Sequence, residues 1–104
     1  MPKLINKHFG MIVSVEPTEK SKDDESWIWR KDYEVFIGII DVYESQHLSK
    51  RKHFIIAYND ERYIKTSVGT LTYTEILNER FIVLKTANSI YTIKLIGTNE
   101  KDGE

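Results

Sequence analysis

The sequence predicts a mainly β protein, built as a small antiparallel barrel or strongly curved sheet of about six or seven short strands. Two observations carry this prediction. β-branched and aromatic residues gather in short runs that alternate with polar residues, and turn-forming residues separate the runs. In addition, 104 residues with 40% hydrophobic and 30% charged side chains are typical of one globular domain with a single core.

The first half of the chain contains two runs that predict strands. Residues 8–16, HFGMIVSVE, alternate so that Phe9, Met11, Val13 and Val15 would share one face. Residues 27–43 are rich in aromatic and β-branched side chains and predict a second strand. Its part from 35 to 42 is apolar at odd and even positions, which indicates burial on both faces or a bend in a closed barrel, with the bend at glycine 38.

The C-terminal part predicts a three-strand meander. We expect two-residue loops at 78–79 and 88–89, because asparagine tolerates the positive φ of a tight hairpin turn. These loops would set Tyr73 opposite Leu84, and Leu84 opposite Ile93. One face of the meander would then form core, with the side chains of Leu71, Tyr73, Ile82, Leu84, Tyr91, Ile93 and Leu95.

The stretch TLTYTEILNERFIVLKTANSIYTIKL resembles small SH3-like and Sm-like β-barrels in its strand pattern, in which a bent strand is followed by two tight hairpins. The resemblance covers about a quarter of the chain and implies a fold only. No signature in it assigns the chain to a family.

The remaining segments define the domain organisation. Residues 44–52 are polar and could form a short helix, which makes an α+β domain the second choice for the fold. Residues 1–98 are expected to form a single domain. Within it the segment 17–26 has no apolar side chain apart from its proline, so we expect a mobile acidic loop. The tail 99–104 is expected to be disordered.

Composition excludes several classes of function. The net charge of −1 does not by itself indicate a nucleic acid partner. The absence of cysteine excludes disulfides, thiolate zinc sites and cysteine nucleophiles. No apolar run is long enough to span a membrane, and the N-terminus MPKLINKHFG has no signal-peptide core. We therefore expect a cytoplasmic protein without membrane contact.

The sequence offers no motif for catalysis. His8, His47 and His53 are not spaced as metal ligands, and no serine lies in a G-x-S-x-G or S-x-x-K motif. Glycine-rich phosphate loops are absent as well. We expect neither an enzyme nor a cofactor.

Two clusters could bind a partner. On a strand, the two tryptophans on either side of isoleucine 28 would point the same way, next to basic residues, and could anchor a protein or stack on bases. The segment SKRKH places three cations in a row, which could contact phosphate. The candidate binding residues are Trp27, Trp29, Arg30, Lys50, Arg51 and Lys52.

The leading functional prediction is a non-catalytic β module that binds a protein partner, of the regulator or inhibitor type. The alternative is a nucleic-acid-binding barrel that uses the same six residues. A small-molecule-binding β domain is third. Exposed strand edges would also allow a homodimer.

Overall fold

The computed structural model describes residues 2–47 and 50–98, and the side chains at 46–47, 50–51 and 97–98 lie outside that description. Its elements are β1 (Lys3–Pro17), the 3₁₀ helix η1 (Glu25–Tyr33), β2 (Ile37–His47), β3 (Lys50–Tyr58), β4 (Tyr63–Lys65), β5 (Gly69–Ile76), β6 (Glu79–Thr86) and β7 (Ser89–Thr98). The prediction of a mainly β fold is confirmed.

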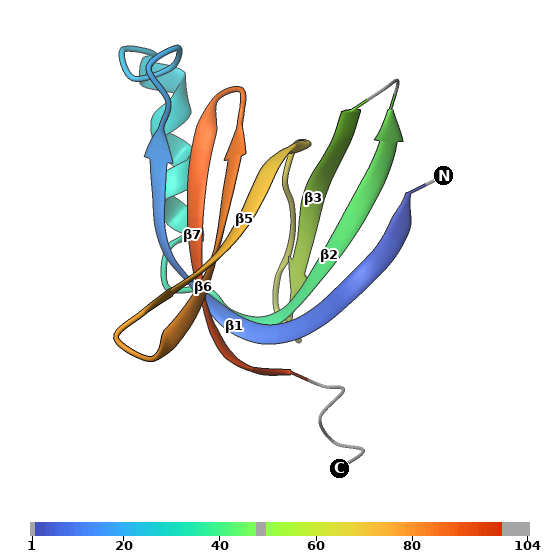
Figure 1. Cartoon of the computed structure of the whole chain (residues 1–104). Coiled ribbons are helices and arrows are strands. Elements are labelled where there is room, and N and C mark those ends of the chain that lie inside the picture. The colour runs from blue at the N-terminus through green and yellow to red at the C-terminus, as the bar shows by residue number, and fades with distance from the viewer. Residues whose placement is uncertain (1, 48–49, 99–104) are drawn as a thin grey trace.

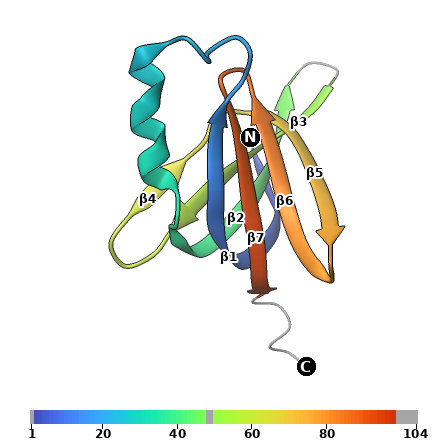
Figure 2. The ribbon, with the colours of Figure 1, turned by 90° about the vertical axis from the view of Figure 1, so that its left-hand side faces the viewer.

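The strands form one antiparallel sheet that closes into a ring. β1 lies between β2 and β7, and β6 and β5 follow β7 in the sheet. β3 pairs with β2 on one side and meets β5 on the other (Figure 1). The ring closes where β5 meets β3 at the single pair of His53 with Gly69. β4 pairs with β3 on the same side as β5, and η1 runs along the outside of the barrel (Figure 2).

Residues 44–47 and 50–52 belong to the β2–β3 hairpin, so the alternative of an α+β domain with a helix at 44–52 is wrong. Residues 48–49 lie outside the described residues. In the part of the chain that the structure describes, no helix is long and apolar enough to cross a bilayer. Beyond the pair of His53 with Gly69, and within the described residues, residues 70–76 of β5 pair only with β6, and β4 pairs only with β3, so a homodimer through exposed strand edges stays a prediction.

The core fills the barrel with one inward row from each strand. Its innermost side chains are fully buried and come from five strands: Ile12, Val15, Ile40, Val42, Ile55, Ile82, Leu84 and Ile93. The predicted core face of the meander is confirmed at Ile82, Leu84, Tyr91, Ile93 and Leu95, all of which are buried.

Both hairpin registers differ from the prediction by two residues. Leu84 lies opposite Tyr91 instead of Ile93, and opposite Leu71 instead of Tyr73. The β5–β6 turn is formed by Leu77 and Asn78, whose φ angles of 52° and 70° are those of a primed hairpin turn. A shift of two residues keeps every side chain on its predicted face, because side chains alternate with a period of two.

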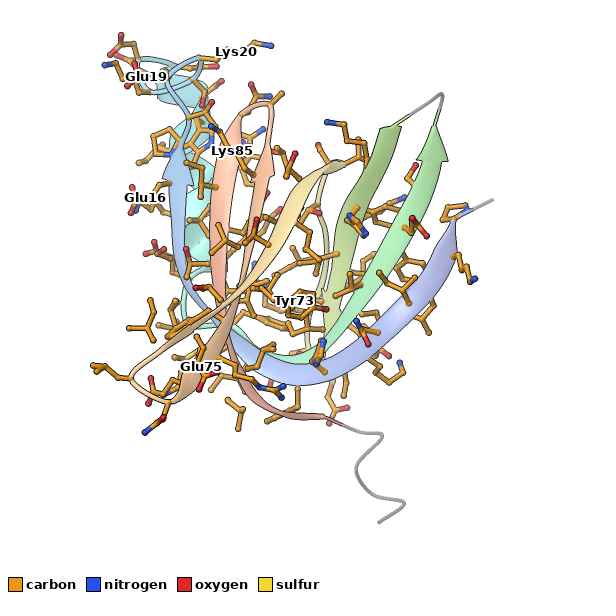
Figure 3. The ribbon with its side chains drawn as sticks, viewed as in Figure 1. Glu16, Glu19, Lys20, Tyr73, Glu75 and Lys85 are labelled. Carbon is orange, nitrogen blue, oxygen red and sulfur yellow. The ribbon has the colours of Figure 1, made fainter. Side chains whose placement is uncertain are left out.

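Tyr73 is the exception on this face. Its side chain is 45% exposed, and Figure 3 shows it directed from β5 across the barrel. There its hydroxyl accepts a hydrogen bond from Asn6 Nδ2 (2.9 Å) and lies 3.2 Å from Nε2 of His8, which is on β1 as well. Tyr73 therefore links β5 to β1 through Asn6 and His8 instead of filling the core.

The predicted faces of β1 and β2 need correction. β1 has irregular pairing with β7 between Phe9 and Gly10 and between Ile12 and Ser14, which breaks strict alternation. As a result Phe9 is 37% exposed, whereas Ile12 is buried. In β2 the even-numbered side chains point inward, but Ile37 is 46% exposed on the other side. The outward side of β2 is therefore covered unevenly, because Asp41 on that side is buried, and the closed ring agrees with the alternative of a strand in a closed barrel.

The acidic segment 17–26 was expected to have nothing to bury, yet two of its side chains are buried. The hydroxyl of Thr18 donates to the carbonyl of Ala87 (2.8 Å), and the hydroxyl of Ser21 donates to the carbonyl of Asn88. These bonds attach the segment to the β6–β7 turn. The mobility of the remaining residues stays a prediction, and the tail 99–104 lies outside the described residues.

Candidate functional site on the outer face of strands β1–β4

The predicted tryptophan strand is a helix. Asp24 caps η1, because its carboxylate accepts bonds from the backbone N–H (3.0 Å) and the hydroxyl (2.7 Å) of Ser26. Glu25 in the first turn and Arg30 and Lys31 in the last turn match the helix dipole. The prediction that both indoles point the same way is therefore wrong: residues two apart on a helix face different directions.

Trp27 is a core residue. It is buried, and its indole N–H donates to the hydroxyl of Ser89 (2.9 Å), which is buried as well. This contact fastens η1 to the start of β7. The indole of Trp27 is therefore not available to a partner on the surface.

Trp29 lies on the solvent side of η1. Its side chain is 55% exposed and packs edge-to-face against Tyr33 at 5.6 Å. The guanidinium of Arg30 lies 4.6 Å from the ring centroid, so it covers part of the indole. Trp29 and Arg30 thus form a small pair on the surface of η1, with Trp29 exposed and Arg30 half-buried.

The basic cluster lies elsewhere. Residues 50–52 open β3, and the side chains of Lys50 and Arg51 are not described. Lys52 lines a hollow of about 450 Å³ together with Lys85 and Thr70. Figures 1 and 2 both show η1 and the β2–β3 hairpin on different sides of the barrel. The structure therefore does not bring the tryptophans and residues 50–52 into one site.

A larger surface, which the sequence analysis missed, follows from the register of β1–β4. Ile40 and Ala57 are paired and point inward, so their neighbours in β2 and β3 point outward. The pairings then set one row of outward side chains across all four strands: Phe9, Ile39, Tyr58 and Tyr63. A second row runs parallel to it: Lys7, Asp41, Ile56 and Lys65.

These two rows, together with the pair Tyr43 and Phe54, are called the aromatic face below. Tyr43 and Phe54 are paired across β2 and β3, and their rings stack at 5.1 Å with an angle of 6°. The ammonium of Lys65 lies 5.4 Å from the Phe54 ring. These neighbours leave Phe54 only 7% exposed although it points away from the core, so the outer face is packed as a layer of its own.

An ion pair lies at the centre of the aromatic face. Lys7 donates to the carboxylate of Asp41 (2.8 Å) and to the hydroxyl of Tyr58 (3.2 Å). The Asp41 side chain is 7% exposed, whereas that of Lys7 is 36% exposed. The hydrogen bond to Asp41 raises the pKa of Lys7 above its ordinary value. Lys7 is therefore protonated at neutral pH, and its ammonium is paired with the Asp41 side chain.

The aromatic face is hollowed next to this ion pair. The hollow has a volume of about 460 Å³ and lies beside the β3–β4 turn. Its lining residues are Asp41, Tyr43, Ile56, Tyr58, Asn59, Arg62 and Tyr63. Tyr63 is 67% exposed at the rim. The hollow offers tyrosine rings and one aliphatic side chain to a ligand group.

Another hollow, of about 400 Å³, lies between the end of β1 and η1. Its floor contains Trp27 and Ile28, and charged side chains surround it. Among these, Lys31 is engaged with both Glu16 (3.0 Å) and Glu34 (3.2 Å). Among the described residues, no group of three or more histidine, aspartate or glutamate side chains is placed to hold a metal ion.

Comparison with protein families, curated proteins and solved structures finds no match to this chain. The similarity of its C-terminal strands to SH3-like and Sm-like barrels stays a resemblance in strand pattern.

Proposed function

We propose that this protein is a non-catalytic module that binds another protein through the aromatic face. The observation that carries the proposal is the row Phe9, Ile39, Tyr58 and Tyr63, which lays apolar and aromatic side chains across four adjacent strands on the outside of the barrel. Exposed apolar and aromatic side chains that lie side by side on a protein surface often mark an interaction site.

The composition of the aromatic face supports a protein partner. Protein interfaces are enriched in tyrosine, phenylalanine and arginine at their centres, and these anchors fill pockets on the partner. Tyr58, Tyr63 and Arg62 surround the hollow. The central Lys7–Asp41 pair is already formed, so a partner that covers it removes a neutralised pair from water and not an isolated charge.

A nucleic acid partner is less well supported on this face. Base stacking would use the same tyrosines, and the phosphates would need cations beside them. Among the described residues Lys52 and Lys65 form no ion pair, but Arg62, which lines the hollow, and Lys7, which contacts Tyr58, are both engaged. Lys7 is bound to Asp41, and Arg62 is bound to Asp32 (3.2 Å). Asp60 and Glu61 add two carboxylates in the adjoining turn. A small molecule in the hollow remains the third candidate, because a volume of about 460 Å³ is within the usual range for ligands.

The test is capture of partners from the source cells by the tagged protein and two variants. Tyr63→Glu removes an exposed ring of the aromatic face, and Leu77→Glu is the matched control because Leu77 is 91% exposed in the β5–β6 turn, away from this face (Figure 1). We expect one protein to bind wild type and Leu77→Glu equally. Its affinity for Tyr63→Glu should fall about 30-fold, because interface anchors contribute about 2 kcal/mol.

The proposal is overturned if Tyr63→Glu retains every partner of the wild type. A labelled oligonucleotide that binds at about 50 mM salt, and loses binding with Lys52→Glu, would favour the nucleic-acid alternative.

A further inference from the structure

The aromatic face carries opposite charges at its two ends. One end is the β3–β4 turn, where the side chain of Asn59 accepts bonds from the backbone N–H groups of Glu61 (2.7 Å) and Arg62 (2.9 Å). This geometry holds Asp60 and Glu61 exposed at the tip. Arg62 is engaged with Asp32, so within the described residues this end is acidic.

The other end is cationic. Lys52 continues the outward side of β3 beyond Phe54, and Lys65, which pairs with Ile56 in the second row, extends its ammonium to the Phe54 ring. Within the described residues neither lysine forms an ion pair, whereas Lys7 in the centre is neutralised by Asp41. The aromatic face therefore runs from an acidic turn, across a neutral aromatic centre, to a cationic end.

We infer that the protein partner of the aromatic face is a second copy of this chain, so this inference rests on the proposed function. A two-fold axis that lies in the plane of the face, perpendicular to β3, would place the acidic turn of one copy on the cationic end of the other, twice. Residue 56 lies midway between 52 and 60, so the axis would pass near Ile56 and the paired Asp41. Such self-complementarity is what a symmetric interface requires.

The dimensions of the aromatic face predict a reversible dimer. The six residue steps from Lys52 to Tyr58 span about 20 Å along β3, and four strands span about 14 Å across. A patch of this size is smaller than the roughly 800 Å² per partner of a standard interface. We therefore expect a dissociation constant in the micromolar range and weakening by salt, which screens exposed charges.

The experiment is sedimentation equilibrium of the whole protein and four single charge reversals. Glu61→Lys reverses the acidic end and Lys52→Glu the cationic end. Asp23→Lys and Lys20→Glu are matched controls, because both residues are exposed in the segment beside η1; Figure 3 shows Lys20 there, away from the β2–β3 hairpin. Each reversal on the aromatic face changes two symmetry-related contacts, so we expect dimerisation to weaken at least about fivefold.

The decisive sample is a mixture of Glu61→Lys and Lys52→Glu. In the mixed dimer both contacts again join opposite charges, so its affinity should return to within about threefold of wild type. The control variants should dimerise like wild type. A wild-type protein that stays monomeric up to about 1 mM at low salt overturns the inference, and so does a dimer that no reversal on the face affects.

Failure of this inference differs from failure of the proposed function. A monomeric protein whose aromatic face still captures a different protein, with loss on Tyr63→Glu, overturns only the self-association. Loss of both self-association and face-dependent capture overturns the proposed function too.

Discussion

The ion pair at the centre of the aromatic face makes an asymmetric prediction for stability. Lys7→Met removes the ammonium but keeps the aliphatic stem, and it leaves the Asp41 carboxylate, 7% exposed, without its cation. Removing one partner of a fully buried pair costs about 3–5 kcal/mol. Because the Lys7 side chain is 36% exposed, water can replace part of the lost interaction, and we expect a loss of about 2–3 kcal/mol.

Asp41→Leu should cost less, about 1 kcal/mol or below, because the ammonium of Lys7 can turn to water. The double variant Lys7→Met/Asp41→Leu should be more stable than Lys7→Met alone, since replacing both charges by apolar groups is often close to neutral. Urea unfolding followed by tryptophan fluorescence measures all three. This reasoning is refuted if the two single variants lose the same stability, or if the double variant loses as much as both single variants together.

Four substitutions test the rest of the structure, each by urea unfolding. Ser89→Ala removes the acceptor of the buried Trp27 N–H and should cost about 1–3 kcal/mol; no change in midpoint would contradict the anchoring of η1. Leu84→Ala should cost about 2–5 kcal/mol and Lys85→Ala under about 0.5, and a reversed order would contradict the register. Glu34→Gln should make the free energy of unfolding depend less on pH in the acid range. The hydrogen bond from the Val15 N–H, aided by Lys31, lowers the pKa of Glu34 below 4.5. The stabilisation by the Glu34 carboxylate is present above pH 4.5 and is lost as pH falls through the lower pKa that Glu34 has in the folded protein. If Glu34→Gln leaves the pH profile of stability unchanged, this reasoning is contradicted.

The faces of the meander could be predicted from the sequence, but its register could not. A period of two determines which side chains share a face, and a shift by two residues leaves that pattern intact. The predicted register set Glu75 against Ile82, an unfavourable pair. In the structure Glu75 lies opposite Arg80, an opposite-charge pair that would have indicated the correct turn.

Helix η1 was missed because the aromatic and β-branched residues of 27–43 favour a strand by propensity. The local signal for a helix was present in the acidic residues before Trp27 and the basic residues after it. Asp24 as a cap, Glu25 in the first turn and Arg30 in the last turn follow the usual pattern of helix ends. Capping therefore outweighed propensity in this segment.

The aromatic face could not be predicted, because it depends on which strands are neighbours. Lys7 and Asp41 are 34 residues apart, and Phe9 joins the row of Tyr63 only through the intervening strands β2 and β3. The sequence did show that β2 is apolar on both sides. That pattern predicts burial on both faces or a bend in a closed barrel. The strand belongs to a closed ring, and its outward residues form part of the aromatic face.

Photo-crosslinking tests the central claim, that the aromatic face binds protein, most directly. A photoreactive phenylalanine analogue replaces Tyr63 in one sample and Thr72, which is exposed on β5, in the other. After irradiation in the source cells we expect a discrete protein adduct from position 63 and none of comparable yield from position 72. An adduct of twice the chain mass would identify a second copy. Equal yields from both positions, or no discrete adduct from position 63, would contradict the account.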